Sequence, residues 1–168
     1  AEVASDDESA VSWRAVADDM HTAAGQRFFN GDLGYIIKGI YREDDEIHED
    51  ETFDISSFFG SFMYGLFTVD SYEMKRTVTK IEEIFRQSEH IALPRYYGDD
   101  YRRRSGESNY WHVTSLWYAQ YCIEVGNIEM AEKILDWCIA HKYESGVMGE
   151  QVDPQTGYTV SPAPLAWS

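Results

Sequence analysis

The sequence predicts an all-α fold built from helical hairpins, with one short strand near residues 34–41. Three observations support this prediction. Apolar residues recur with the period of a helix over most of the chain, and two pairs of such segments look like copies of one repeat. In addition, hydrophobic residues make up 43% of the 168 residues, which is enough material for a core. At about 100–200 residues per domain, the chain is one domain or a piece of a larger one.

The first helix is expected over residues 7–28, after a loose acidic lead at residues 1–8. Its expected apolar face consists of Val11, Val16, Met20 and Ala24, with Trp13 and Ala17 beside them. Such spacing is typical of a helix that is buried on one side.

A turn and a strand are expected after this helix. Asn30-Gly31-Asp32 has the composition of a turn. The β-branched and aromatic residues at 34–41 indicate a short strand. Residues 42–54 are so rich in Asp and Glu that we expect a solvated acidic loop there.

Two helical hairpins follow, over residues 54–85 and 111–141. In each, the first helix is apolar nearly all round and the second has one apolar face. Residues 69–74 (VDSYEM) align with residues 125–130 (VGNIEM), which suggests an internal repeat. Apolar inner helices paired with amphipathic outer helices fit an α-toroid or an α-solenoid, and the long loops favour the toroid.

The charge balance excludes several classes of partner. The chain has 14 Lys and Arg against 30 Asp and Glu, a net charge of −16. This charge repels nucleic acids and anionic membranes, and no apolar stretch is long enough to span a bilayer. We therefore expect no nucleic-acid or membrane partner and a cytoplasmic location. Cys122 and Cys138 are expected to be buried free thiols, and the histidines show no metal-ligand spacing.

The long loops hold the residues suited to chemistry. Residues 93–101 read LPRYYGDDY, and residues 145–167 form a long irregular connection with an isolated Glu-Gln pair. Aromatic rings stack on the CH faces of sugars, while arginine and carboxylates bind the hydroxyls. These loops therefore predict a carbohydrate site.

Four strings carry a resemblance to a known family: LPRYYGDDY at 93–101, NYWHVTSLW at 109–117, GVMGEQVDPQTG at 146–157 and SPAPLAWS at 161–168. Together they resemble the C-terminal part of glycoside hydrolase family 15, which comprises glucoamylases, glucodextranases and some α,α-trehalases. The resemblance implies an (α/α)6 toroid, inverting hydrolysis of an α-linked oligosaccharide or disaccharide by two carboxyl groups, and no metal or organic cofactor.

The resemblance also implies roles for individual residues. Glu150 matches the general base, and Arg95 matches an arginine that holds sugar hydroxyls. The other implied substrate-binding residues are Tyr101, Trp111, Asp100 and Gln151.

Structural roles remain open for three of these residues. Glu150 could instead cap a turn, Arg95 could pair with Asp99 or Asp100, and Trp111 could be a core residue.

The sequence departs from the family pattern in three respects. Tyr110 and Gly149 each stand where the family often has proline. In addition, the family's general acid lies in a Trp/Glu motif that this chain lacks, since Trp13 is followed by Arg14. We therefore expect residues 1–168 to be a C-terminal fragment of a glucoamylase-like catalytic domain, with the base but without the acid.

Such a fragment should turn over little substrate and could self-associate through an exposed inner-helix face. The alternative is a non-catalytic α-helical repeat module that binds a protein or a glycan.

Overall fold

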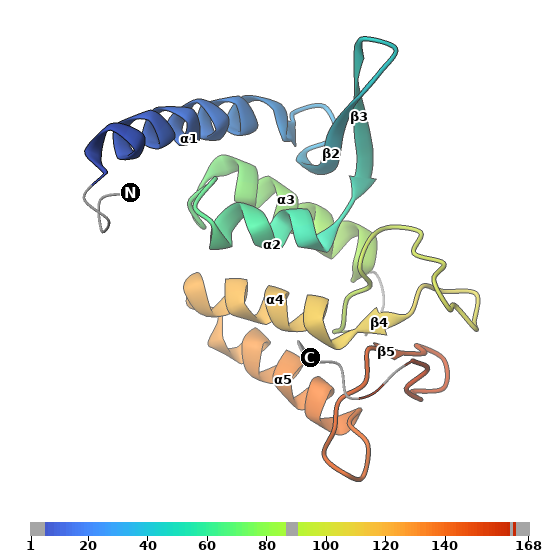
Figure 1. The fold of residues 1–168 in the computed structure, drawn as a ribbon. Coiled ribbons are helices and arrows are strands. Elements are labelled where there is room, and N and C mark those ends of the chain that lie inside the picture. Colours follow the sequence, from blue (N-terminus) through green and yellow to red (C-terminus); the bar gives the residue numbers. More distant parts are fainter. Residues whose placement is uncertain (1–5, 87–90, 162, 164–168) are drawn as a thin grey trace.

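The computed structural model describes residues 6–86, 91–161 and 163. Within these ranges the chain forms five helices and five strands (Figure 1). In chain order the elements are α1 (Asp7–Arg27), β1 (Phe29–Asn30), β2 (Tyr35–Glu43), β3 (Glu46–Phe53), α2 (Ile55–Met63), α3 (Tyr72–Phe85), β4 (Tyr110–Trp111), α4 (His112–Glu124), α5 (Ile128–Ala140) and β5 (Gln151–Val152).

The strands form two antiparallel sheets, one with the order β1-β2-β3 and one that pairs β4 with β5. The fold is therefore mixed α and β. The expected all-α class, with helical hairpins forming part of an (α/α)6 toroid, is wrong. The short strand predicted at 34–41 is present as β2, and it is longer than expected.

The expected acidic loop at 42–54 is instead the second strand of a hairpin. Glu43 pairs with Glu46, so that Asp44 and Asp45 alone form the turn. Their φ angles of 47° and 64° are left-handed, as two-residue hairpin turns require, and Asp tolerates this conformation better than most residues. Most of β3 is exposed or half-buried. It therefore lacks the apolar alternation by which a strand is recognised in a sequence.

Helices α3 and α5 lie close to their predicted positions, and each begins at a side-chain cap. Ser71 caps α3 by accepting a hydrogen bond from Met74 N at 3.2 Å. Asn127 likewise caps α5 by accepting from Met130 N at 3.3 Å. Side-chain caps of this kind satisfy backbone N–H groups that the first turn of a helix leaves free.

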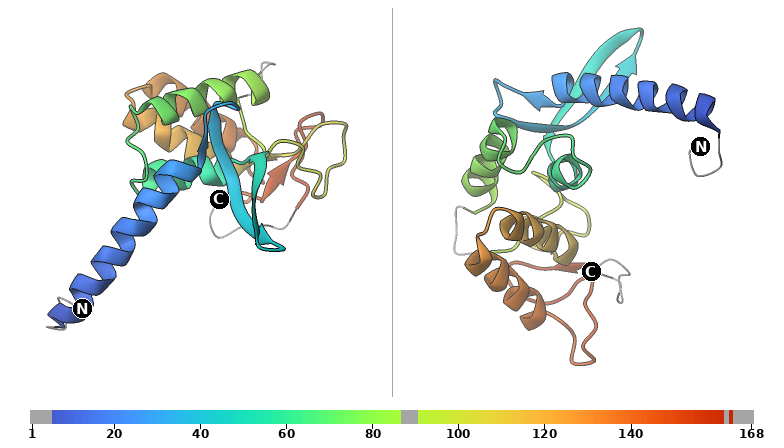
Figure 2. Two further views of the ribbon diagram at one scale, coloured as in Figure 1. Left: turned by 90° about the horizontal axis from the view of Figure 1, so that it is seen from above. Right: turned by 90° about the vertical axis from the view of Figure 1, so that its left-hand side faces the viewer.

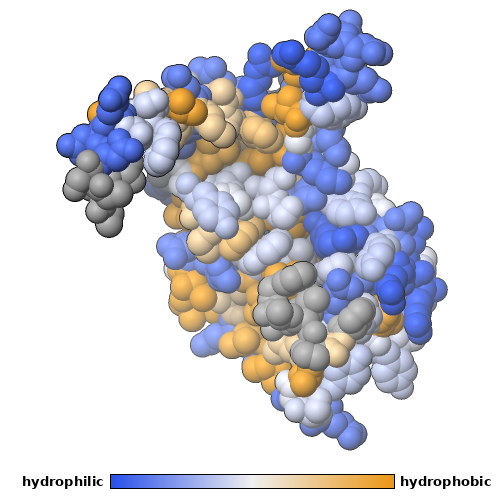
Figure 3. Space-filling view, in the orientation of Figure 1, coloured by the Kyte–Doolittle hydropathy of each residue, from blue (hydrophilic) through white to orange (hydrophobic). Residues whose placement is uncertain are grey.

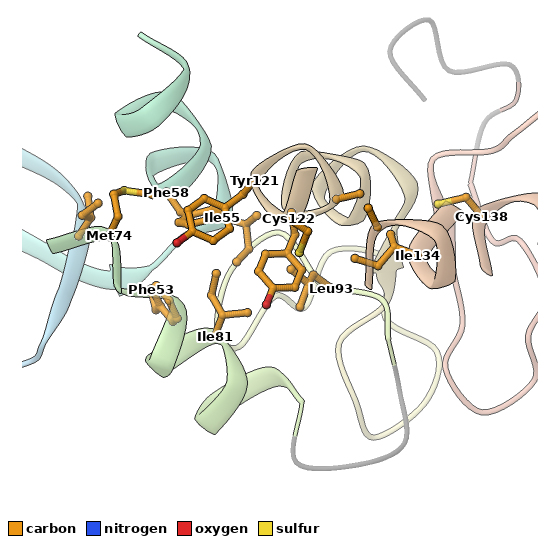
Figure 4. Close-up of a cluster of buried hydrophobic side chains, with 14 residues drawn as sticks. Phe53, Ile55, Phe58, Met74, Ile81, Leu93, Tyr121, Cys122, Ile134 and Cys138 are labelled. Carbon is orange, nitrogen blue, oxygen red and sulfur yellow. The ribbon is translucent and has the colours of Figure 1, made fainter. Parts of the chain in front are cut away.

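The core runs from β3 through α2, α3 and α4 to α5, as Figure 4 shows. Helix α4 contributes the most buried residues, with Tyr118, Tyr121 and Cys122 among them. Ile81 of α3 and Ile134 of α5 are completely buried. The apolar stripe predicted for α3 is therefore the face that this helix buries. In α5, Ile134 and Cys138 of the predicted stripe are buried, whereas Leu135, which was predicted with them, is 47% exposed.

Helix α1 projects away from the rest of the molecule in both views of Figure 2. Residues 1–5 of the expected loose lead lie outside the described part of the chain, and Asp7 and Glu8 already belong to α1. The predicted apolar face is not buried, since Trp13 is 64% and Met20 68% exposed. Figure 3 shows apolar surface where α1 meets the body of the molecule, whereas the β2–β3 hairpin is hydrophilic. None of the described helices has the length and hydrophobicity needed to cross a bilayer.

Helix α5 offers a matched test of the core. Ile134→Ala should lower the free energy of unfolding by about 2–5 kcal/mol, because it removes a fully buried side chain and leaves a cavity. The neighbouring Leu135→Ala should change it by less than about 0.5 kcal/mol, because Leu135 is 47% exposed. Urea titrations followed by circular dichroism measure both values. Equal losses for the two variants would contradict this packing of α5.

Candidate functional site

The backbone of residues 93–97 runs across the first turns of α2 and α4. Ile55 N at the start of α2 donates a hydrogen bond to Arg95 O at 2.8 Å. Trp111 N, just before α4, donates to Leu93 O at 2.9 Å. Isolated β-bridges join Asp54 to Tyr96 and Leu93 to Trp111. The loop that contains Arg95 is thereby attached to the amino-terminal ends of both helices.

Two hydroxyl groups in the first turn of α4 strengthen this attachment. Thr114 Oγ1 donates to Leu93 O at 2.9 Å, and Ser115 Oγ accepts from Leu93 N at 2.9 Å. Helix α4 has no side-chain cap of its own. These side chains hold the crossing segment in register instead.

The two-stranded sheet brings a third segment to the same place. Strand β4 pairs with β5 in antiparallel register, with Trp111 opposite Gln151 and Tyr110 opposite Val152. Because Glu150 immediately precedes β5, it lies beside Trp111, although 39 positions separate the two in the sequence.

One cavity of about 550 Å³ lies between these segments. It is bordered by the loop at residues 93–97, the starts of α2 and α4, the residue before β5, and β2. Its lining residues are Lys38, Asp54, Ser56, Arg95, Tyr96, Trp111, Val113, Thr114, Trp117 and Glu150. Three of the residues predicted from the sequence, Arg95, Trp111 and Glu150, are therefore brought together in one cavity. Two other cavities, of about 480 and 420 Å³, share Ile84 and Tyr97 and contain none of the predicted residues.

Arg95 is held by a carboxylate and by aromatic rings. Its Nε and Nη2 donate to the two oxygens of Asp99 at 2.8 and 2.9 Å. The guanidinium carbon lies 4.3 Å from the centroid of the Trp111 ring and 5.1 Å from those of Tyr96 and Tyr101. The two bonds to Asp99 use two of the five N–H donors of the guanidinium. One edge of the Arg95 guanidinium thus forms an ion pair with Asp99, one of the two partners that the sequence left open. The other N–H donors of Arg95 remain for a ligand.

The charge state of this pair follows from its surroundings. Burial of Asp99 opposes ionisation, but hydrogen bonds from Arg95 and from Tyr101 N outweigh it, and the pKa of Asp99 lies below its ordinary value. Hydrogen bonding to Asp99 correspondingly raises the pKa of Arg95. Both groups are charged near neutral pH.

The remaining predicted residues lie outside the cavity lining. Gln151 is completely buried, and its amide Nε2 donates to Glu150 Oε2 at 3.1 Å. The ring of Tyr101 lies 6.4 Å from that of Trp111, centroid to centroid. Asp100 is exposed, and its carbonyl accepts a hydrogen bond from Arg103 N.

Sequence reasoning missed several lining residues, of which Lys38 and Asp54 are charged. Lys38 comes from β2, lies 4.7 Å from the Tyr96 ring centroid and pairs with Asp50 at 3.7 Å. Asp54 caps α2, with its Oδ1 accepting from Ser56 N at 2.7 Å and from Ser57 N at 3.3 Å. The Asp-x-Ser pattern signals the cap, but nothing local signals that the cap borders a cavity.

A buried histidine fixes the backbone in front of Glu150. The Nδ1 of His112, the first residue of α4, lies 3.0 Å from Gly149 O. Because a carbonyl only accepts hydrogen bonds, this ring nitrogen carries the proton. Burial lowers the pKa of His112, so the ring is neutral near pH 7.

No group of three or more His, Cys, Asp or Glu side chains among the described residues could hold a metal ion. Cys122 and Cys138 are buried free thiols, as predicted, and burial raises their pKa values to about 11 and about 12.

Comparison with known protein families finds no match. The chain is 26% identical over 152 residues to an uncharacterised glycosyl hydrolase of Methanocaldococcus jannaschii, covering 79% of this chain and 24% of that protein. A solved structure described as a wild-type glycosidase shares the fold with a TM-score of 0.66 and 15% identity, covering 84% of this chain and 34% of its own. The chain thus spans about a quarter of the curated relative and a third of the structural one, and both are named as glycosidases.

The Arg95–Asp99 pair can be tested by pH. Asp99→Asn should cost about 1–3 kcal/mol at pH 7, because it removes the charged acceptor of two partly buried hydrogen bonds. Since the folded-state pKa of Asp99 is depressed, this contribution is fully present above its unfolded value of about 3.9 and is lost as the pH falls through the lower folded value.

Urea unfolding of the wild type and the variant between pH 7 and pH 3 measures this difference. The exposed Asp100→Asn is the matched control and should leave stability unchanged at every pH. If the loss of unfolding free energy caused by Asp99→Asn did not become smaller at low pH, the lowered pKa of Asp99 would be contradicted.

The glycine before Glu150 gives a second test. A Cβ at Gly149 would overlap the Cγ2 methyl group of Thr159, so Gly149→Ala should destabilise the fold by about 1–3 kcal/mol. Thr159→Ser deletes that methyl group and should restore most of the loss in the double variant. Thermal unfolding of the four proteins measures this coupling, and no rescue would mean that Gly149 is required for another reason.

Proposed function

We propose that the cavity between β2, α2 and α4 binds a sugar ring, and that Glu150 is the general base of an inverting, glucoamylase-type glycoside hydrolase of family 15. The substrate would be an α-linked glucoside. The observation that carries the proposal is that Arg95, Trp111 and Glu150, singled out from separate loops, line the same cavity.

The chemistry of the lining suits a carbohydrate. Tyr96, Trp111 and Trp117 provide rings against which the CH face of a sugar can pack. The N–H groups of Arg95 that do not bond to Asp99 would bind sugar hydroxyls.

The lining of the cavity holds two cationic and two anionic side chains, although the chain as a whole carries −16. Lys38 and Arg95 stand against Asp54 and Glu150. A cavity of this kind does not demand a charged ligand, and this agrees with a neutral sugar. The acidity of the rest of the chain is concentrated elsewhere, in part on the β2–β3 hairpin.

The surroundings of Glu150 support the proposed role of a base. It is half-buried, lines the cavity and receives a hydrogen bond from Gln151. In inverting hydrolysis, the base removes a proton from a water molecule that attacks the sugar from the face opposite the leaving group.

The second carboxylate of the lining, Asp54, is poorly suited to be the general acid. Its Oδ1 accepts hydrogen bonds from Ser56 N and Ser57 N and thereby caps α2, so this oxygen already has a structural role. We therefore propose that the acid belongs to a part of the enzyme outside residues 1–168. The small share of the relatives that the chain spans supports this proposal.

The test is Glu150→Gln in an active polypeptide that contains this chain. Turnover of maltooligosaccharides or trehalose should fall about 10²–10⁴-fold with little change in KM, because the substitution removes the base but keeps the shape of the side chain. Glu144→Gln, an exposed carboxylate six residues earlier, is the control and should retain full activity.

Two results would count against the proposal. If Glu150→Gln kept its activity, the base would be another residue. If the polypeptide bound maltose without hydrolysing it, the cavity would belong to a glycan-binding module.

A further inference from the structure

A chain of buried amide groups leads from the loop at residues 101–104 to Glu150. Asn109 Nδ2 donates to Arg102 O at 3.2 Å and to Gln151 Oε1 at 2.8 Å. Gln151 Nε2 in turn donates to Glu150 Oε2 at 3.1 Å. Asn109 is 2% exposed and Gln151 is completely buried, so water does not compete for these bonds.

The donor and acceptor roles along this series of amide hydrogen bonds are fixed at Arg102, the end farthest from Glu150. The carbonyl of Arg102 can only accept, so Asn109 must present its NH₂ group rather than its oxygen. With that orientation, the second N–H of Asn109 requires the oxygen of Gln151 opposite it. Gln151 must then turn its own NH₂ group toward Glu150, which is the orientation that a carboxylate needs.

The backbone at Arg102, where the series of amide hydrogen bonds begins, is strained. Arg102 has a φ of 54°, a left-handed conformation that is rare for a residue other than glycine, Asn or Asp. Strain of this sort persists only where the surroundings hold it, and it is concentrated at functional sites. Here it accompanies the carbonyl that sets the direction of the amide chain.

We infer that Asn109 and Gln151 are positioning residues, which act on the reaction through Glu150 by orienting its carboxylate. The inference rests on the proposed function and deepens it. It changes the role of Gln151, because a buried amide whose two ends are bonded to Asn109 and Glu150 serves the carboxylate rather than the sugar.

The decisive variant is Asn109→Asp, which keeps the shape of the side chain but replaces the donor with an acceptor. Gln151 can then only donate toward residue 109, so its amide turns and presents its oxygen to Glu150. The repulsion should displace the carboxylate of Glu150 while leaving the rings and Arg95 in place.

Two ligands separate this effect from a loss of the site. Deoxynojirimycin is an imino sugar whose ammonium group pairs with a carboxylate, whereas maltose is neutral. Titration calorimetry of the full chain should show that Asn109→Asp weakens the imino sugar about tenfold, the expected effect of losing one charge-assisted bond, and leaves maltose binding nearly unchanged.

A double-mutant cycle tests whether the effect passes through Gln151. Gln151→Met removes the intermediate amide at similar volume and should weaken the imino sugar to a similar degree. In the Gln151→Met background, Asn109→Asp should then have no further effect, because the connection to Glu150 is already broken. If Asn109→Asp fails to fold, the selective loss of the imino sugar in Gln151→Met decides the question.

The outcomes are distinguishable. If the wild-type chain binds neither ligand, the proposed sugar site is wrong. If it binds both and the variants weaken them equally or not at all, the sugar site stands and the positioning role is wrong. Selective, non-additive loss of the imino sugar supports the role.

Discussion

The backbone of residues 93–97 is the constraint on which the site depends. Its hydrogen bonds to Ile55 N and Trp111 N attach one irregular segment to the starts of both α2 and α4. Helix starts expose backbone N–H groups that need acceptors, and the carbonyls of Leu93 and Arg95 supply them. The side chain of Arg95 is thereby fixed beside Trp111, and the pairing of β4 with β5 adds Glu150 to the same wall.

Most of the polar groups behind the cavity serve to hold others in place. Asp99 neutralises and orients Arg95, His112 holds Gly149 O, and Gln151 holds Glu150. Each of these side chains is almost fully buried, so its hydrogen bonds carry a high cost if broken. The groups that face the cavity are therefore presented from a rigid support, as binding and catalysis both require.

Much of the helical part of the fold was predictable. The stripes of α3 and α5 and the caps at Ser71 and Asn127 are local signals, because apolar spacing and capping each operate within a few residues. The hairpin strand β3 was not predictable in this way. It is mostly exposed, so its stability comes from hydrogen bonds to β2 rather than from an apolar face of its own.

The sequence by itself determined which residues could do chemistry: an arginine, aromatic rings and a Glu-Gln step in loops that had no reason to form core. Only the tertiary structure decided which of them meet. Arg95, Trp111 and Glu150 share a cavity, whereas Asp100 points to solvent-exposed surface and Gln151 lies behind Glu150. The physical reason is that the two-residue pairing of β4 with β5, and the crossing of residues 93–97 over two helix starts, join segments far apart in the chain by backbone hydrogen bonds. Such bonds leave no mark on the side-chain pattern, since every residue type has a backbone acceptor and every type except proline has a backbone donor.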